Sequence, residues 1–314
     1  MQAFFGQSKG CAQADFSGRM VVLCVCAGVI LGCGGTPSDG IHYTYHPNGS
    51  VHTEYTYQNG VQEGPFREFD GQGRILFSGR ITDGVTKGNK RTYYTGGEVK
   101  SEEEYVDNIR WGSSRLYFPN GRLQQQAVYD QGKMNGLVKD YSPDGNLERE
   151  RTYKNNELHG LFREYDGRAL RLERNYQNGL LSGASVEFFP NGARFKEETY
   201  KDGRLEGLSK EYDAEGKIVA ERVYEGGDLK VERTFYPKGW VMKEVFFQNG
   251  KQVGVKKYFE GERLMSEQKF VDEVLAEETE YSEYGQPVIR KIYEDGVFIR
   301  NIYYDATGRE QRTQ

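Results

Sequence analysis

The side chains that most often carry out chemistry are few in this chain and lie near its beginning. Three of its four histidines, His42, His46 and His52, stand close together. Imidazole nitrogens are common ligands of zinc and copper, so the group invites comparison with a metal site. However, the turn Pro47-Asn48-Gly49 separates His52 from the other two, and the sequence forces no carboxylate beside them. We therefore interpret the three as exposed polar residues and predict no bound metal.

The motifs of common enzyme classes are absent from the sequence. There is no His-Glu-x-x-His zinc motif, no Gly-x-Ser-x-Gly nucleophile motif and no Gly-x-x-x-x-Gly-Lys-Ser/Thr phosphate loop. Gly71-Gln72-Gly73 could open a dinucleotide loop, but Leu76 stands where the third glycine belongs, and no long helix is expected after it. We predict a turn there. The chain is not expected to be an enzyme, to have catalytic residues or to bind a cofactor.

The four cysteines are the other chemically reactive group, and all lie in the first 33 residues, at Cys11, Cys24, Cys26 and Cys33. They cannot form a disulfide framework for the rest of the chain. An apolar run at residues 21–31 follows Lys9 and Arg19. At this length it is shorter than the roughly 20 residues that span a bilayer, so it is typical of a signal-peptide core.

The segment Ile30-Leu31-Gly32-Cys33 resembles the lipobox of bacterial lipoproteins. The resemblance implies that the Cys33 thiol receives a diacylglycerol group and that cleavage just before it makes Cys33 the first mature residue. The simpler alternative is an incidental cysteine in an ordinary signal peptide. The expected division is a signal peptide at 1–32, a flexible linker at 33–40 and a folded part at 41–314. By resemblance, Gly34 after the cysteine implies the outer membrane in an organism with two membranes.

Net charge argues against a nucleic-acid partner. The chain has 42 Lys and Arg against 47 Asp and Glu, a formal charge of −5, and the basic residues are scattered along it. Nucleic-acid binders usually show a basic patch or stripe. Hydrophobic residues make up only 36% of the chain. We therefore expect no large aliphatic core of the kind found in many α/β enzymes.

Two interleaved series of aromatic residues recur every 23 to 24 residues beyond residue 41. The first series is Tyr57, Tyr105, Tyr129, Tyr153, Tyr176, Tyr200, Tyr224, Phe247, Phe270 and Tyr293, with Ile81 in the one missing place. The second series is Tyr45, Phe69, Tyr93, Tyr117, Tyr141, Tyr165, Phe188, Tyr212, Phe235, Tyr258, Tyr281 and Tyr304. Two series predict two strands per repeat.

Each aromatic residue stands just before a cluster of Gly, Asn, Asp or Pro, such as Asn59-Gly60 or Pro119-Asn120-Gly121. These clusters are turn signals of β-hairpins, and Tyr, Phe, Val and Thr favour strands. Between Tyr165 and Tyr176 one residue is missing beside Asp166-Gly167, so we expect turns to absorb changes in length. The sequence predicts short antiparallel strands throughout 41–314.

The repeats resemble the bacterial variant of the MORN repeat, which carries Tyr-x-x-Gly-x-x-x-Gly. The motif is complete at Tyr57-x-x-Gly60-x-x-x-Gly64, Tyr129-x-x-Gly132-x-x-x-Gly136 and two later places, whereas Val231 replaces the second glycine in another repeat. Proteins of this kind are often labelled YwqK-type antitoxins. The resemblance implies an all-β fold, an elongated twisted antiparallel sheet of about 11 tandem hairpins.

Charged residues repeat with the same period. A glutamate stands three residues before most members of the first aromatic series, and Arg or Lys stands two residues before most members of the second. A hairpin closing near Gly60-Val61 places Glu54 opposite Arg67. The same register pairs Glu102 with Arg115, Glu150 with Arg163 and Glu197 with Lys210. The resulting ladder suits either a solvated face, which we favour, or a face that binds a partner.

Two functions fit these features. The first is a lipid-anchored protein of the cell envelope that acts as a scaffold for a protein partner, attached to the membrane through Cys33. The second is an antitoxin-like or immunity-like protein that neutralises a specific toxin, which only the family label suggests.

Overall fold

Short strands joined by tight turns make up the part of the chain that the computed structural model describes, residues 36–311. Its 27 strands belong to one sheet. No helix capable of crossing a membrane occurs in this range. The predicted signal peptide, Cys33 and the first part of the linker lie outside the described residues. Residues 37–314 form one unit of the chain, and the description below concerns this unit alone.

The first strands lie between residues 40 and 141. They are β1 (Gly40–Tyr45), β2 (Val51–Gln58), β3 (Val61–Phe69), β4 (Ile75–Thr82), β5 (Val85–Thr86), β6 (Gly88–Tyr93), β7 (Val99–Val106), β8 (Ile109–Tyr117), β9 (Leu123–Asp130), β10 (Lys133–Met134) and β11 (Gly136–Tyr141).

The middle strands lie between residues 147 and 235. They are β12 (Leu147–Lys154), β13 (Glu157–Asp166), β14 (Ala169–Gln177), β15 (Leu180–Phe188), β16 (Arg194–Lys201), β17 (Arg204–Leu205), β18 (Gly207–Tyr212), β19 (Ile218–Glu225) and β20 (Asp228–Phe235). The last strands are β21 (Val241–Gln248), β22 (Lys251–Tyr258), β23 (Leu264–Val271), β24 (Val274–Tyr281), β25 (Pro287–Glu294), β26 (Val297–Tyr304) and β27 (Glu310–Gln311).

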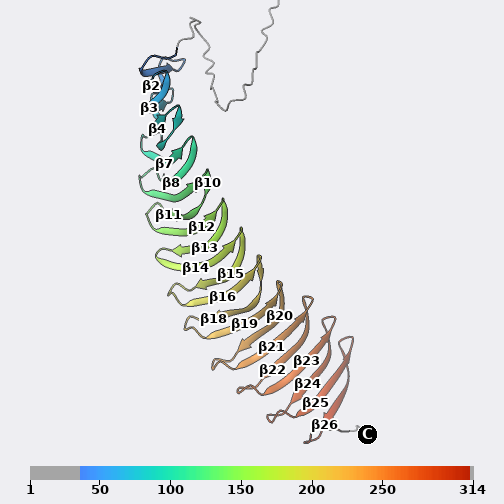
Figure 1. Ribbon diagram of the computed structural model, residues 1–314. Helices are drawn as coiled ribbons and strands as arrows, with labels where there is room; N and C mark the ends of the chain where they lie inside the picture. Colours follow the sequence, from blue (N-terminus) through green and yellow to red (C-terminus); the bar gives the residue numbers. More distant parts are fainter. Residues whose placement is uncertain (1–35, 312–314) are drawn as a thin grey trace, which may run out of the picture. The chain divides into compact units, whose positions relative to one another are not determined.

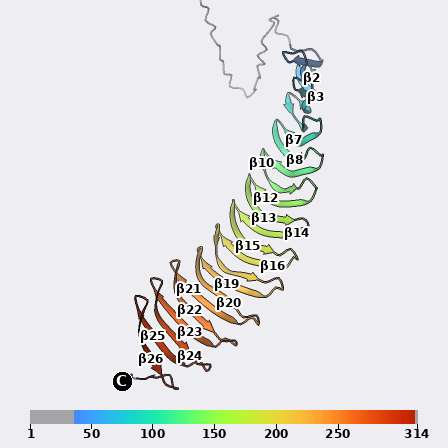
Figure 2. The same cartoon turned by 180° about the vertical axis from the view of Figure 1, so that it is seen from behind.

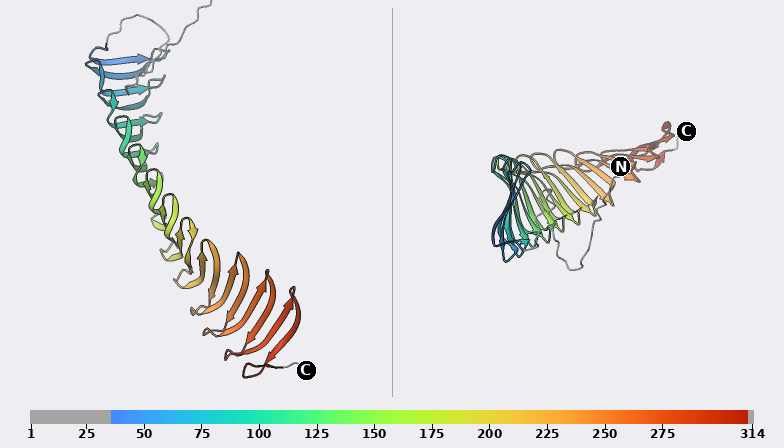
Figure 3. Two further views of the ribbon diagram at one scale, coloured as in Figure 1. Left: turned by 45° about the vertical axis from the view of Figure 1, so that its right-hand side comes forward. Right: turned by 90° about the horizontal axis from the view of Figure 1, so that it is seen from above.

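The strands pair in chain order, each antiparallel to the one before it, so the sheet is a continuous series of hairpins (Figures 1 and 2). In three places two labelled strands are parts of a single strand, because both pair with the same neighbour. These are β5 and β6, β10 and β11, and β17 and β18. Strand direction turns progressively from β2 to β26 (Figure 3), as the right-handed strand twist requires. The all-β class and the open, twisted sheet of tandem hairpins are therefore confirmed.

Two kinds of turn alternate along the sheet. The short turns have two residues with positive φ, for example Asn59 at 52° and Gly60 at 76°. This is the type I′ turn, which explains the Asn, Asp and Gly residues there. The long turns run over residues such as 46–50, closed by His46 N donating to Ser50 O at 2.8 Å and Gly49 N to His46 O at 2.9 Å.

Backbone bulges explain why the repeat length changes from 24 to 23 residues. In the earlier repeats the strand after a short turn has two extra residues, as where Tyr57 pairs with Gln62 but Tyr55 pairs with Phe66. From β20 onward there is one extra residue, as where Tyr224 pairs with Leu229 and Val223 with Val231. The change occurs where valine replaces the second motif glycine. In the earlier repeats that glycine has positive φ, so the wider bulge requires it.

The buried apolar side chains lie on one face of the sheet. They are Phe66, Ile81, Ala127, Val138, Leu172, Ala220, Val245 and Val255. Strand alternation places the first aromatic series on this face, which we call the core face. Its predicted structural aromatics, Tyr57, Tyr105, Tyr129, Tyr153, Tyr176, Tyr200, Tyr224 and Tyr293, are all half-buried. Aliphatic side chains and Phe66, with the half-buried tyrosine rings beside them, therefore make up the apolar core of this single-layer sheet.

Candidate functional site

A row of mostly charged residues runs from β2 to β25 on the face opposite the core, which we call the ladder face. It has one residue from each successive strand, and neighbours in the row are direct cross-strand partners. In order, the row is Glu54, Arg67, Ser78, Arg91, Glu102, Arg115, Gln126, Lys139, Glu150, Arg163, Glu173, Val186, Glu197, Lys210, Glu221, Arg233, Glu244, Lys256, Glu267, Thr279 and Arg290.

The four cross-strand pairs expected from the sequence are present. Glu54 faces Arg67, and the equivalent pairs are Glu102 with Arg115, Glu150 with Arg163 and Glu197 with Lys210. The structure adds the pairs across the long turns, which join these separate pairs into one row. Arg91 Nε, for example, donates to Glu102 Oε1 at 2.8 Å from the strand on the other side. Most ladder carboxylates therefore lie next to at least one cation.

Tyrosines of the second aromatic series complete these sites. Their hydroxyls donate to ladder carboxylates, from Tyr117 to Glu102 at 2.9 Å and from Tyr165 to Glu150 at 3.0 Å. The bonds from Tyr212 to Glu197 and from Tyr258 to Glu244 follow the same pattern. The second series therefore lies on the ladder face, and the first lies on the core face. The sequence already indicated this arrangement. Glutamate stands three residues before the first series, and residues three apart in a strand lie on opposite faces. Arg or Lys stands two residues before the second series, and residues two apart lie on the same face.

The carboxylates lie deeper in the ladder than the cations. The Glu150 side chain is 14% exposed, whereas those of Arg67 and Arg91 are 55% and 50% exposed. Because the cationic groups form the outer surface of the ladder, a molecule approaching it meets guanidinium and ammonium groups first. The ladder is therefore not a uniformly solvated mixture of both signs.

The pKa values of the ladder groups agree with this arrangement. Burial opposes ionisation of Glu102, but hydrogen bonds from Tyr117 and Arg91 and the charges of Arg91 and Arg115 outweigh it, so its pKa is lowered. The pKa values of Glu150 and Glu244 are lowered in the same way. Burial and the bond to Glu197 raise the pKa of Tyr212 to about 12. These carboxylates are held ionised, so they are poor candidates for acid catalysis.

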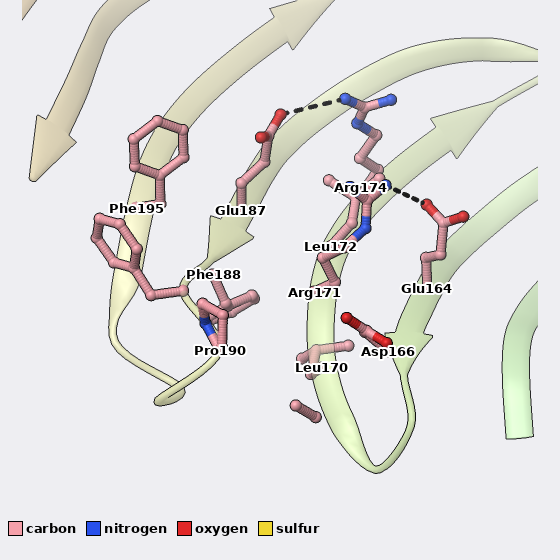
Figure 4. A pocket seen from close by; sticks show the side chains of 12 residues that line it. Glu164, Asp166, Leu170, Arg171, Leu172, Arg174, Glu187, Phe188, Pro190 and Phe195 are labelled. Carbon is pink, nitrogen blue, oxygen red and sulfur yellow. Dashed lines mark hydrogen bonds and ion pairs between the residues drawn. The ribbon is translucent and has the colours of Figure 1, made fainter. Parts of the chain in front are cut away.

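A hollow of about 710 Å³ lies on the core face, beside the hairpin of β13 and β14 (Figure 4). This hairpin is the one in which a turn absorbs the missing residue. Asp166 pairs directly with Ala169, leaving two residues between them instead of the usual longer turn. The neighbouring hairpin of β15 and β16 has the full turn, with Phe189 N bonded to Ala193 O at 2.8 Å. The hollow thus adjoins the irregular turn that the sequence had placed at Asp166-Gly167.

The hollow has an aromatic wall and paired charges. The rings of Phe189 and Phe195 meet edge to face, with centroids 5.1 Å apart. Opposite them, Arg171 is 3.0 Å from Glu164, and Arg174 is 3.5 Å from Glu187 (Figure 4). Because these charges already have partners, the hollow is better suited to binding an apolar side chain of another molecule than to catalysing a reaction.

The three histidines near the start of the sheet, which we interpreted as exposed, are half-buried. His52 Nε2 lies 3.7 Å from Glu68 Oε1, and the other two lie within hydrogen-bond distance of backbone carbonyls. His46 Nε2 lies 2.9 Å from Phe69 O, and His42 Nε2 lies 2.7 Å from Ser38 O. The His46 and His52 rings pack with centroids 4.4 Å apart. No cluster of three His, Cys, Asp or Glu side chains suited to a metal ion occurs within residues 36–311.

Comparisons with known proteins concern the repeats. Two solved structures, one titled "Crystal Structure of TcdB2-TccC3" and the other a Photorhabdus luminescens Tc holotoxin pore, are each 12% identical over 86% of this chain, with TM-scores of 0.18 and 0.17. This chain spans 17% of each of those chains. The search of curated proteins finds no match.

Four segments of this chain match the model of the MORN repeat variant, at residues 38–59, 134–155, 205–225 and 229–249. Each match covers a hairpin closed by a long turn, such as β1 with β2 or β20 with β21. Since the same hairpin recurs across the sheet, the chain is a repeat protein that contains MORN-variant repeats.

Proposed function

We propose that this chain is a lipid-anchored repeat protein of the cell envelope and that the ladder face of its sheet binds a protein partner. The observation that carries the proposal is an apolar row beside the ladder. Leu208, Val223, Val231 and Phe246 are consecutive cross-strand partners on that face. Leu208 is 42% exposed. A purely solvated face has no physical need for a continuous apolar row.

The arrangement suits a protein better than a small molecule. The apolar row extends over four strands, β18 to β21, and the ladder runs from β2 to β25, whereas the hollow of about 710 Å³ beside β14 has the size of a small-ligand site. A flat surface with apolar contacts flanked by charges is the usual anatomy of a protein interface. The attachment to the membrane rests on the resemblance of Ile30-Leu31-Gly32-Cys33 to a lipobox.

Crosslinking in intact cells tests the binding proposal. A photo-crosslinking amino acid at Leu208 should capture a discrete partner, which mass spectrometry then identifies. The control carries it at Phe298, an apolar residue that is 50% exposed and pairs with Tyr293 of the core face. Equal capture at both positions, or none at Leu208, would count against the ladder face as the interface.

The identity of the captured protein separates the two functions. Envelope proteins at Leu208 support the scaffold, whereas a toxin encoded beside this chain would favour an antitoxin-like or immunity-like role. Membrane attachment is tested separately with Cys33→Ala. This variant should lose fatty-acid labelling and leave the membrane fraction, and its full retention in that fraction would refute the anchor.

A further inference from the structure

One ladder position between two arginines has a short hydroxyl side chain where most equivalent positions have a glutamate. Ser78 on β4 is the direct partner of Arg67 on β3 and of Arg91 on β6. Elsewhere in the ladder, Glu102, Glu150 and Glu244 stand between two cations. Ser78 therefore interrupts the alternation of charge.

The regular positions show which group this arrangement binds. Glu150 is a good example, because Lys139 Nζ lies 3.0 Å and Arg163 Nη1 lies 3.7 Å from its carboxylate oxygens. The hydroxyl of Tyr165 donates to the same group at 3.0 Å. Two flanking cations and a tyrosine hydroxyl thus form a carboxylate site inside the chain.

The same parts surround Ser78. Tyr93 occupies the position that Tyr165 has beside Glu150, and its hydroxyl lies 2.8 Å from Ser78 Oγ. A serine side chain lacks the second methylene and the carboxylate of glutamate, so the two hydroxyls stand where the inner carboxylate would otherwise lie. Each hydroxyl has one proton, so one of them donates to the other in this bond, and the accepting hydroxyl can donate its own proton to an oxyanion.

The two arginines can accept a further carboxylate. Arg91 Nε bonds Glu102 at 2.8 Å, and Arg67 Nη1 lies 3.6 Å from Glu54, in each case on the side away from Ser78. Arg163 shows that one guanidinium can serve both sides, because it lies 2.7 Å from Glu173 and 3.7 Å from Glu150. Guanidinium has five N–H donors, which is enough for two carboxylates.

The local balance of charge also favours an external anion. Gln126 replaces a second glutamate of the ladder, so the stretch from Arg67 to Lys139 contains four cations and one carboxylate, Glu102. Beyond Lys139 the two signs are nearly balanced. The excess of positive charge is therefore confined to the stretch that contains Ser78.

We propose that Arg67, Arg91, Ser78 and Tyr93 bind the carboxylate of an acidic side chain presented by a partner protein. This inference rests on the proposed function, because it names the chemistry of the partner at one point of the ladder face. The partner's carboxylate takes the position that the chain's own glutamate takes at Glu150. Binding should weaken as salt increases, since the two arginines are about half exposed.

A fluorescent peptide of alternating Gly and Glu, with a Gly-Gln peptide as its control, tests the site on the full chain by fluorescence anisotropy. Ser78→Glu supplies the internal carboxylate and should weaken binding of the Glu peptide by about tenfold or more. Gln72→Glu adds the same charge at the nearby turn and should leave affinity within about twofold. Ser78→Glu restores the arrangement of the regular repeats, so denaturation should show a stability at least equal to the native chain.

Three results would overturn the proposal. They are equal affinity of the native chain for the Glu and Gln peptides, unchanged affinity in Ser78→Glu, and competition by inorganic phosphate much stronger than by acetate at equal ionic strength, which would assign the site to phosphate. Peptide binding by the purified chain, together with no crosslinked partner in cells, would refute the scaffold function while the carboxylate site stands.

Discussion

The hydroxyl of Tyr117 donates a 2.9 Å hydrogen bond to Oε2 of Glu102, which lies on the neighbouring strand between Arg91 and Arg115. This contact links the second aromatic series to the ladder, and its geometry recurs at Tyr165 and Glu150. The tyrosine hydroxyl compensates part of the hydration that the carboxylate loses through burial. The ladder is therefore part of the packing of the sheet as well as its charged surface.

Replacing Tyr117 with Phe should reduce the free energy of unfolding by about 1 to 2 kcal/mol, because the half-buried Glu102 loses a donor. The pKa of Glu102 should rise toward its ordinary value, which NMR titration of the carboxyl carbon measures. Tyr141→Phe is the matched control, because the ladder residue at the equivalent position beside Tyr141 is the uncharged Gln126 rather than a glutamate. An equal loss in both variants would mean that the effect does not come from the carboxylate.

Acid should destabilise the sheet through the ladder carboxylates. The pKa values of Glu102, Glu150 and Glu244 are lowered below 4.5, so the folded state binds fewer protons than the unfolded state near that pH. Their contribution is complete above pH 4.5 and is lost as pH falls through the folded-state values. Urea unfolding between pH 7 and pH 3 should show this decline, and Glu102→Gln should make it shallower. A flat profile would contradict it.

Alkaline pH should also destabilise the sheet, in this case because tyrosine hydroxyls lose their protons. The pKa values of Tyr200 and Tyr212 are raised from 10 to about 12, so the unfolded chain loses these protons first. Stability is therefore unaffected below pH 10 and falls between pH 10 and pH 12. Ultraviolet absorbance of tyrosinate at 295 nm, measured beside circular dichroism, should show ionisation of these residues only as the sheet unfolds. Ionisation of every tyrosine near pH 10 in the folded protein would refute this.

A matched pair of glycines tests the two kinds of bulge. Gly136 and Gly254 occupy the same place in the repeat motif, but Gly136 has φ of +111°, whereas Gly254 lies outside the left-handed region. Gly136→Ala should cost about 1 to 3 kcal/mol through backbone strain. Gly254→Ala should be nearly neutral, because its nearest neighbour, at 3.5 Å, is at ordinary contact distance. Equal losses in denaturation would show that strain is not the cause.

Damage to one repeat should remain local. Tyr153→Ala removes a half-buried ring that pairs across its strand with Leu158 and Gly136, at a cost of about 3 kcal/mol. Stability in an array is nearly a sum of local and neighbour terms. Hydrogen exchange should rise around residues 130–180 and stay unchanged near Tyr57 and Tyr293. Loss of protection in a single step over the whole chain would indicate one cooperative unit.

The sequence by itself determined the hairpins and much of their register. Type I′ turns need two residues with positive φ, so pairs such as Asn59-Gly60 mark the hairpin ends directly. Closure near Gly60-Val61 predicts Arg67 as the partner of Glu54. The turn itself lies at Asn59-Gly60, and the two extra residues of the bulge give the same pairing. The shortened turn at Asp166-Gly167 could also be located from the sequence, because the period of the aromatic series is kept on both sides of it.

Only the tertiary structure decided which side chains meet across neighbouring strands. Each bulge adds one or two residues to one strand, so the number of bulge residues decides which partner a side chain meets. The turn residues in the sequence do not indicate that number. The bond from Tyr117 to Glu102 and the pairing of Ser78 with both Arg67 and Arg91 depend on that count and on contacts across the long turns. The sequence shows serine in place of glutamate, whereas the pairing places this serine between two arginines.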